Sequence, residues 1–492
     1  IASCLVGSEM CIRDRPINTE IIMKHNSLKF LFIAASISIG LSSCDGYLDQ
    51  MPSNALPSDE SINNIEDVGS ALNGVYSGLL SSEYYGADFI SRAEVGGEDV
   101  QTSTPSKRTE NFYKFMYRQN NAPTGLWKIP YQVINRVNVL LQAIESGKIT
   151  ASPQLDNAKG EALAVRALCN FNLNIVYGYP YQKDKGASLG APIVEKVLTA
   201  NDMPARNTVA EGYEAIEKDL TTALGLVSDK VNDGHFNKWA VLGLQARVYL
   251  YKGNYDAAFN CAETIIKESP YKLIQNADYL AAWSNEYTSE SILDLHVSDL
   301  SSGNRELFGY LVDPKGYAAI AATDAFIELL NEYPNDVRLG LLKEDAAGVK
   351  CIINKYPGRN GASTVNNIRV IRLSDIYLIA AEAALRKSSP DQAKANSYLN
   401  KIIKRAIPTA SDVVATLPMI DRERRKELVL EGHRLNDILR VGGTVTREGG
   451  RHFLNNTDLI SPNWNDYRCV MPIPQAEIDA NVNLQGQQNP EY

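Results

Sequence analysis

The sequence has few of the cysteines and histidines that would build a zinc site or a framework of disulfides. Its seven cysteines form no CxxC pair and no dense spacing, which excludes a zinc ribbon and a small disulfide-stapled scaffold. Its five histidines are scattered, and neither HExxH nor the phosphate loop GxxxxGKS/T occurs. We therefore expect neither a metal nor a cofactor.

Positive charge is also scarce. The chain has 49 Lys and Arg residues against 58 Asp and Glu residues, a formal net charge of −9 at pH 7. An acidic surface repels phosphate backbones, so we expect no nucleic-acid partner. Hydrophobic residues make up 44% and charged residues 22% of the 492 residues, which is typical of a globular protein large enough for one long helical array.

A short apolar run near the N-terminus follows a basic start. We take Met23 as the start, Lys24 and Lys29 supply positive charge, and residues 28–40 form the apolar run. The run is too short to cross a bilayer comfortably, and the small residues after it are typical of a secretory signal. The sequence therefore predicts a signal peptide over residues 23–43.

The signal ends in Leu41-Ser42-Ser43-Cys44, which resembles a lipobox. In that interpretation Cys44 becomes the first mature residue and is acylated on its sulfur and its amino group. Each acyl methylene that enters the bilayer contributes roughly 0.8 kcal/mol, so more than one chain anchors stably. The alternative is an ordinary signal peptide followed by an incidental cysteine. Residues 1–22 fit neither interpretation, and we interpret them as a non-native read-through segment and leave them out of the fold prediction.

Apolar residues recur at three- and four-residue spacing over much of the chain, which predicts amphipathic helices. The clearest pair covers residues 238–267, with a break at Gly253-Asn254. A second pair covers residues 373–405, where Ser389 is expected to cap the second helix. A charge-rich helix is expected from Glu423 to the Gly442-Gly443 pair. Small residues that face large ones let the paired helices pack closely, as in a tetratricopeptide repeat.

The pairs are not contiguous along the sequence. Long irregular segments with turn signals separate them, mainly 81–122, 178–208, 270–320 and 341–368. Loops on a rigid scaffold are where binding residues usually lie. We therefore predict a mainly α fold, in which interrupted tetratricopeptide-like helix pairs form a scaffold and long loops with a few short strands form the ligand side.

Several stretches, in order along the chain, resemble the SusD/RagB family. They are Cys44–Asp49, Lys159–Ala167 with its continuation to Gly178, Asp336–Arg338, Arg372–Ala383, Glu423–Leu428 with Glu431–Arg434 and Asp437, and Pro472–Ile478 with Asn489–Tyr492. The resemblance covers the chain from about Cys44 to Tyr492. It implies a single SusD-like domain over residues 44–492, with an N-terminal part to about residue 300 and a C-terminal part from about residue 301.

The family resemblance also implies a function. Members of the SusD/RagB family are helical lipoproteins with four tetratricopeptide-like helix pairs. They lie on the cell surface over a SusC-like, TonB-dependent barrel in the outer membrane, bind oligosaccharides and help deliver them to the barrel. They cleave no bond. By resemblance we expect the same partners here: the barrel, an oligosaccharide, and outer-membrane lipid through Cys44.

A sugar site should combine aromatic rings with directional polar groups, because sugars present apolar C–H faces and many hydroxyls. The segment from Ser82 to Asp99 has this mixture, and so does the segment that follows the strand-like Ser289–Leu293. The ligand-binding candidates are Tyr84, Tyr85, Asp88, Arg92, Trp283, Asn304, Tyr310 and Tyr317. Each could instead be structural, because the chain has 25 tyrosines and such residues are common at partly buried helix ends.

Two other functions fit part of the sequence. A secreted helical-repeat adaptor would bind a peptide or protein in a groove between the helices. A glycoside hydrolase would need two carboxylates about 5–10 Å apart across a cleft. Glu98 and Asp99 are adjacent in sequence, and nothing indicates an opposed carboxylate. We therefore expect a binding protein without catalytic residues. The sequence does not identify its glycan.

Overall fold

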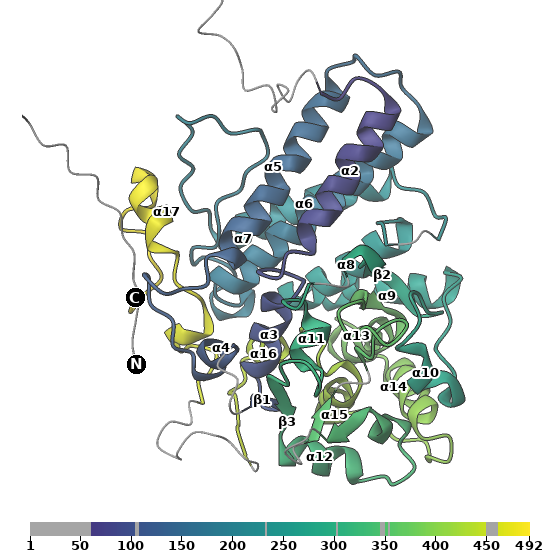
Figure 1. The fold of residues 1–492 in the computed structure, drawn as a ribbon. Coiled ribbons are helices and arrows are strands. Elements are labelled where there is room, and N and C mark those ends of the chain that lie inside the picture. Colours follow the sequence, from purple (N-terminus) through teal and green to yellow (C-terminus); the bar gives the residue numbers. More distant parts are fainter. Residues whose placement is uncertain are drawn as a thin grey trace, which may run out of the picture. The chain divides into compact units, whose positions relative to one another are not determined.

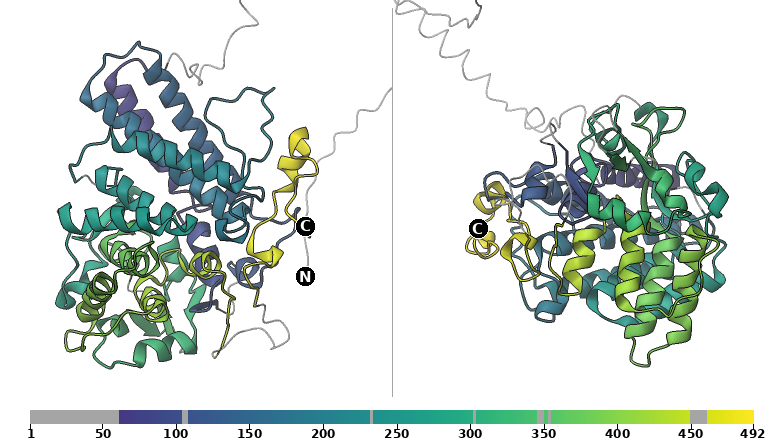
Figure 2. Two further views of the ribbon diagram at one scale, coloured as in Figure 1. Left: turned by 180° about the vertical axis from the view of Figure 1, so that it is seen from behind. Right: turned by 90° about the horizontal axis from the view of Figure 1, so that it is seen from below.

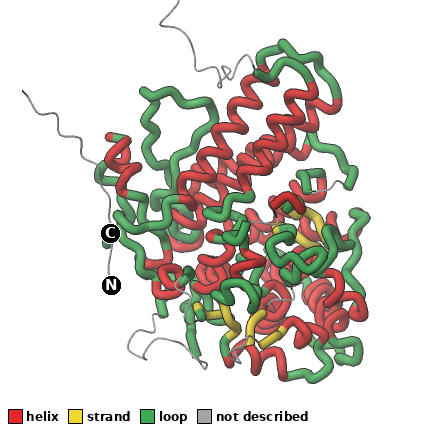
Figure 3. The backbone as a smooth tube through the Cα atoms, in the orientation of Figure 1, coloured by secondary structure: helices red, strands yellow, loops and turns green. Residues whose placement is uncertain are grey.

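The computed structural model describes residues 61–103, 108–231, 234–301, 304–344, 350–352, 355–448 and 461–492. These residues form helices, a few short strands and long connections, which confirms the predicted mainly α fold (Figure 3). The predicted signal peptide, Cys44 and residues 1–22 lie outside the described residues. Within the described part, no helix has both the length and the apolar character needed to span a membrane.

The N-terminal half is built on a layer of long helices that pack side by side (Figure 1). These are α2 (Ile65–Leu79), α5 (Gly125–Glu145), α6 (Pro153–Tyr177) and α7 (Val209–Leu224). Helix α6 lies between α5 and α7 and is buried on all faces over most of its length, because Ala, Leu, Val and Phe occupy every side of it. Ser152 begins α6 by accepting a hydrogen bond from the Leu155 N–H at 3.2 Å.

The second layer contains the two helix pairs predicted from the sequence. They are α8 (Lys238–Lys252) with α9 (Tyr255–Glu268), and α13 (Leu373–Arg386) with α14 (Gln392–Ala406). Gly253 ends α8 with φ +80, and Asn254 then caps α9. Helix α9 packs against α13, so the two pairs form one array although a long segment separates them in sequence. The yellow-green helices of this array lie side by side when seen from below (Figure 2).

Shorter elements fill the connections. The short helices are α3 (Asp88–Val95), α4 (Glu110–Lys114), α10 (Tyr279–Ala282), α11 (Phe308–Val312), α12 (Asp324–Asn331), α15 (Leu417–Leu428), α16 (Arg434–Arg440) and α17 (Gln475–Ala480). The 3-10 turns are η1 (Tyr181–Lys183), η2 (Asn276–Asp278), η3 (Asp299–Ser301), η4 (Val337–Leu341), η6 (Tyr467–Cys469) and η7 (Val482–Leu484).

The described strands form antiparallel pairs. Strand β1 (Val100–Thr102) pairs with β3 (Ile320–Ala322), with Val100 opposite Ala322. Strand β2 (Ser291–Leu295) pairs with β6 (Ile368–Arg372). This confirms a strand where Ser289–Leu293 was expected to be strand-like, although the strand begins at Ser291 and ends at Leu295. Strand β4 (Leu342–Glu344) pairs with β5 (Lys350–Ile352). These short pairs join distant loops rather than form a large sheet.

Two details of the helix prediction were wrong. The cap of α14 is Asp391, whose side chain accepts from the Lys394 N–H at 3.0 Å, and not Ser389. The helix expected from Glu423 onward is interrupted over residues 429–433, between α15 and α16.

The interruption has a specific cause. Leu430 and Gly432 adopt left-handed conformations there, with φ of 63° and 86°. The Leu430, Gly432 and His433 N–H groups donate to the buried Glu94 carboxylate at 2.8 Å each. Glu94 thus replaces the helical hydrogen bonds that residues 430–433 give up. Burial raises the pKa of Glu94 to about 7, although the three N–H groups oppose the shift.

A network of buried ion pairs joins β6, α14, α15 and η4. Glu427 on α15 contacts Arg372 at 2.8 Å, Arg405 at 2.5 Å and Arg338 at 3.2 Å, and all four side chains are at most 4% exposed. Arg405 also contacts Glu290 at 2.7 Å. Burying an ion costs several kcal/mol unless opposite charges and hydrogen bonds compensate. The network therefore requires these elements to meet in one arrangement.

Glu427 is the carboxylate at the centre of this network. Burial alone would raise its pKa, but the positive charges of Arg405 and Arg372 outweigh burial and hold the pKa well below its ordinary value. The folded protein therefore keeps Glu427 ionised. Its negative charge compensates the positive charges of the buried guanidinium groups.

Replacing Glu427 with glutamine tests this network. The substitution removes one of the buried counter-charges of Arg372 and Arg405, so we expect the free energy of unfolding to fall by about 3–5 kcal/mol at pH 7. Chemical denaturation followed by circular dichroism measures the change. Glu145→Gln is the matched control, because Glu145 forms an exposed ion pair with Lys159 at 2.8 Å and such pairs contribute about 0–1 kcal/mol.

The lowered pKa also fixes the sign of the pH dependence. Below the ordinary glutamate pKa of about 4.3 the unfolded chain binds a proton that folded Glu427 does not take up. The stabilisation is therefore complete above that pKa and is lost as the pH falls. Between about pH 6 and pH 3, wild-type stability should fall more steeply than that of the Glu427→Gln variant. Equal slopes would contradict the proposed role of Glu427.

Candidate functional site

The two segments that the sequence nominates for ligand binding meet in space. The Phe308 N–H donates to the Gly86 carbonyl oxygen at 2.6 Å, which joins the start of α11 to the turn before α3. Pairing of β1 with β3 joins the same two regions a few residues further on. Figure 1 shows α3 and α11 next to each other. Residues far apart in the chain therefore contribute to one surface.

Tyr84 and Tyr85 are buried instead of lying on an exposed loop as expected. They are 1% and 5% exposed, and both hydroxyls accept hydrogen bonds from the Asn172 amide on α6, at 2.6 Å and 3.0 Å. Their rings also pack against Phe89. Burial raises the pKa of both tyrosines, which keeps the hydroxyls neutral. These two side chains anchor the turn to α6.

Arg92 and Trp283 are also buried, against the expectation of exposure. Arg92 donates to the Cys469 carbonyl oxygen at 3.0 Å, so it ties α3 to the C-terminal segment. The Trp283 ring packs beneath Lys355 at 5.0 Å and Arg372 at 5.4 Å, next to the buried ion network. Neither side chain is accessible to a ligand in this conformation.

The other candidates lie at the surface, around two tyrosine rings. The rings of Tyr310 and Tyr317 meet edge to face, with centroids 5.0 Å apart and planes at 88°. Both side chains are half-buried, and so is Asp88, the first residue of α3, whose carboxyl lies near Glu306. Asn304 is exposed on the segment that leads into α11. We call the group Asp88, Arg108, Asn304, Arg305, Glu306, Tyr310 and Tyr317 the Tyr310–Tyr317 surface.

A tight turn holds the two rings together. The Tyr317 N–H donates to the Tyr310 carbonyl oxygen at 3.0 Å, and the Asp313 carboxylate accepts from the Lys315 N–H at 2.9 Å. A Cβ atom at Gly316 would lie 2.3 Å from the Tyr310 carbonyl oxygen. Only glycine therefore fits at position 316 without opening the turn.

Arg108 and Glu306 belong to this surface but were missed from the sequence. The Arg108 guanidinium lies 3.6 Å from the centre of the Tyr317 ring. Glu306 accepts hydrogen bonds from Arg108 at 2.7 Å and from the Tyr317 hydroxyl at 3.2 Å. Arg305 lies 5.7 Å from the Tyr310 ring centre. Arg108 and Glu306 are 198 positions apart, so no local pattern could have paired them.

Asp88 has an unusual protonation equilibrium. Burial raises its pKa to about 7, and the nearby carboxylates Glu83 and Glu306 add to the shift. Near neutral pH the Asp88 carboxyl is therefore partly protonated, and it can donate a hydrogen bond as well as accept one. A sugar hydroxyl can use either role.

Glu98 and Asp99 are engaged by arginines. Arg434 contacts Glu98 at 2.6 Å and Arg425 contacts Asp99 at 2.5 Å. Both carboxylates are buried, so they form part of an internal ion network. His433 is buried nearby, and burial lowers its pKa to about 4, as expected of a neutral packing residue. Among the described residues, no group of three or more His, Cys, Asp and Glu side chains is arranged to hold a metal ion.

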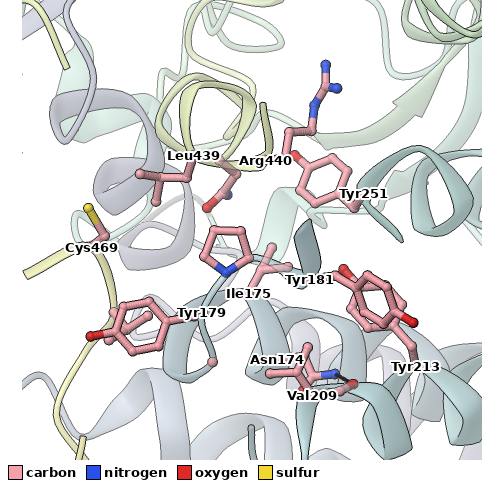
Figure 4. Close-up of a pocket in the computed structure, with 14 residues that line it drawn as sticks. Asn174, Ile175, Tyr179, Tyr181, Val209, Tyr213, Tyr251, Leu439, Arg440 and Cys469 are labelled. Carbon is pink, nitrogen blue, oxygen red and sulfur yellow. Dashed lines mark hydrogen bonds between the residues drawn. The ribbon is translucent and has the colours of Figure 1, made fainter. Parts of the chain in front are cut away.

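The tyrosine-lined pocket of Figure 4 is too small for an oligosaccharide. Tyr179, Tyr181, Tyr213 and Tyr251 line it together with Leu439, and its volume is about 20 Å³. This is room for about one water molecule. Three larger cavities have volumes of about 960, 700 and 570 Å³.

The cavity of about 960 Å³ lies along α14, where a peptide-binding groove would be sought. The Asn400 side chain donates to the Val413 carbonyl oxygen at 2.8 Å and accepts from the Val413 N–H at 2.9 Å. Asn396 accepts from the Ala415 N–H at 2.7 Å, and Gln392 donates to the Ala415 carbonyl oxygen at 2.9 Å. The amide groups of α14 therefore bind an extended segment of the same chain.

Comparison with known proteins identifies the family. Residues 46–250 match a SusD-like family described as "Starch-binding associating with outer membrane", and residues 349–492 match the SusD family. A SusD superfamily protein from Bacteroides vulgatus is 37% identical, with a TM-score of 0.83 over 87% of this chain and 99% of that one. The chain belongs to the SusD/RagB family.

More distant SusD-like proteins agree with this identification. SusD-like protein P25 of Formosa agariphila is 23% identical over 513 residues, which cover 89% of this chain and 94% of that protein. A protein described as "Laminarin binding SusD-like protein" shares the fold, with 22% identity and a TM-score of 0.71 over 87% of this chain and 100% of that one. This SusD-like chain is thus a member of a carbohydrate-binding family associated with the outer membrane.

Proposed function

We propose that this SusD-like protein captures oligosaccharides at the cell surface and delivers them, uncleaved, to a SusC-like, TonB-dependent barrel in the outer membrane. Residues 44–492 act as a single domain in this proposal, and the acylated Cys44 anchors it. The observation that carries the proposal is the Tyr310–Tyr317 surface, where two half-buried aromatic rings lie among charged and polar side chains. Family membership supports the ligand class.

The rings supply the apolar contact that a sugar needs. A pyranose presents flat patches of C–H groups, which lose hydration favourably against an aromatic face. Because Tyr310 and Tyr317 stand at 88° to each other, they offer a corner rather than a plane. Such a corner fits a bent or twisted oligosaccharide better than a flat ribbon.

Polar groups around the two tyrosine rings can form directional hydrogen bonds with a sugar. Glu306 fixes the Tyr317 hydroxyl and Arg108 fixes its ring, so little side-chain freedom is lost when a ligand binds. Asp88 can donate or accept because its pKa is near 7. Arg305 and Asn304 are exposed at the edge and can reach sugar hydroxyls.

The structure favours capture over the two alternative functions. Glu98 and Asp99, the adjacent carboxylates considered for hydrolysis, are held in buried ion pairs with arginines. The α14 groove considered for peptide binding has its amide side chains engaged with residues 413–415. The two carboxylates are thus engaged elsewhere than in hydrolysis, and the α14 amide groups are engaged elsewhere than in peptide binding. A carbohydrate-binding role needs neither set of groups.

Alanine substitution of the two rings tests the ligand site. We expect Tyr310→Ala and Tyr317→Ala each to weaken oligosaccharide binding about tenfold, roughly 1.4 kcal/mol, through loss of ring contact. A glycan array identifies a ligand, and affinity electrophoresis with isothermal titration calorimetry measures the change. Tyr333→Ala is the matched control, because Tyr333 is a 51% exposed tyrosine after α12. If the double variant is retarded like the wild type on every glycan that binds, the site assignment is wrong.

The anchor is tested by Cys44→Ser. Without the thiol no diacylglycerol can be attached, so we expect the protein to move from the membrane fraction to the soluble fraction of cells. Immunoblotting of the fractions measures this, and mass spectrometry of the wild-type N-terminus should show an acylated cysteine. An unmodified mature N-terminus in the wild type would contradict the anchor.

The transporter partner is tested by purification from its native membrane. Antibody capture from detergent-solubilised outer membranes should recover a large β-barrel protein in near-stoichiometric amount. The same capture from cells that lack the protein gives the background. Repeated recovery of the protein alone would argue against delivery to a barrel.

A further inference from the structure

A cavity of about 570 Å³ lies between the C-terminal half of α2 and the turn and strand around β2. Two pairs of rings line it: Tyr76 with His235, and Tyr287 with His296. The polar side chains Asn73, Ser77, Glu286 and Ser298 complete most of the wall. None of these residues belongs to the Tyr310–Tyr317 surface. The cavity is therefore a second concave place where rings and hydrogen-bonding groups occur together.

The first pair of rings is fixed by a buried carboxylate. The centroids of Tyr76 and His235 lie 4.1 Å apart. The Tyr76 hydroxyl donates to Glu161 at 2.9 Å and accepts from the Phe236 N–H at 2.8 Å. His235 Nδ1 lies 2.9 Å from the same Glu161 oxygen. The pair keeps its position without a ligand, because Glu161 on α6 is itself buried.

The second pair is more accessible. The Tyr287 and His296 rings are nearly parallel, with an interplanar angle of 18° and centroids 6.3 Å apart. His296 Nδ1 lies 2.9 Å from Glu286, and these two side chains are 43% and 46% exposed. Gly234 lets Tyr287 approach closely, since an added Cβ there would lie 3.2 Å from the Tyr287 hydroxyl. An exposed ring such as His296 offers an apolar face that a sugar can contact.

The composition of the wall selects the kind of ligand. No lysine or arginine occurs among the described residues that line the cavity, so nothing there would pair with a carboxylate or sulfate group. Glu286 in the wall and Glu161 behind it would repel an anionic sugar. The volume lies within the range of about 300–1,000 Å³ that small-molecule sites occupy.

We infer that the α2–β2 cavity is a second carbohydrate site, which takes a short neutral stretch of a glycan. The inference rests on the proposed function, because it assumes that the protein binds glycans. Two sites on one protein would hold one long polysaccharide at two points. When the polysaccharide leaves one site, the other site still holds it, so it can rebind at the first. The cavity thereby adds retention of long chains to the capture provided by the Tyr310–Tyr317 surface.

The test uses variants in the background of Tyr310→Ala with Tyr317→Ala. Ser77→Phe places a large ring in the cavity from an exposed position on α2. Ser70→Phe is the matched control, because Ser70 is exposed on the same helix and does not line the cavity. His296→Ala is a second variant, which removes an exposed ring and does not disturb α2. Thermal unfolding checks that each variant is folded.

The probes are neutral hexasaccharides of α-1,4-glucan, β-1,3-glucan, β-1,4-glucan, β-1,4-mannan and β-1,4-xylan, with hexagalacturonate as the anionic probe. Calorimetry should show that the background variant retains binding of at least one neutral hexasaccharide. Ser77→Phe and His296→Ala should each weaken that binding at least tenfold, and Ser70→Phe should leave it unchanged.

Several results would overturn the inference. Unchanged affinity in folded Ser77→Phe and His296→Ala would exclude the cavity. Loss of all binding in the background variant, when the wild type binds, would exclude the cavity and leave the proposed function standing. Hexagalacturonate binding that Ser77→Phe abolishes would exclude the neutral ligand class. Failure of the wild type to bind any glycan would reject the proposed function and this inference with it.

Discussion

Burial of ionised side chains is the constraint on which the C-terminal part of the structure depends. Glu290 illustrates this constraint, because its buried carboxylate has several partners. Its carboxylate accepts from the Ser374 N–H at 3.1 Å at the first turn of α13, and it also receives Arg405 at 2.7 Å and the Ile274 N–H at 2.9 Å. A carboxylate at a helix N-terminus is stabilised by the helix dipole. With Glu427 close by, the two acids neutralise guanidinium groups that apolar packing alone could not accommodate.

A few residues on α3 and in the turn before it connect this part of the structure with the candidate ligand surface. Glu94 on α3 holds the break between α15 and α16, and Arg92 on the same helix holds the segment that contains Cys469. The turn before α3 is pinned to α6 by Tyr84 and Tyr85, and it contacts the start of α11 through Gly86. The loops that carry Tyr310 and Tyr317 therefore rest on fixed supports at both sides. A rigid support reduces the conformational entropy lost on binding.

The sequence predicted features whose causes are local and missed those whose causes are distant. The α8–α9 pair could be predicted because Gly253, Asn254 and the apolar spacing lie within one segment. The break after α15 could not, because its carboxylate is 336 positions from Leu430. Tyr84 has the composition of a ligand residue, yet its partner Asn172 is 88 positions away and withdraws it from solvent. Type and spacing nominated two segments that meet in space, whereas tertiary partners decided which side chains in them are exposed.

The segment that binds the amide side chains of α14 has a consequence for selectivity. Residues 413–415 are tethered to α14 by a short connection, so their effective concentration at the Asn396 and Asn400 side chains is on the order of millimolar or higher. A free peptide of similar intrinsic affinity would have to reach that concentration before it displaced them. These amide groups are therefore engaged by the protein's own chain, and a free peptide meets a competitor that is always present.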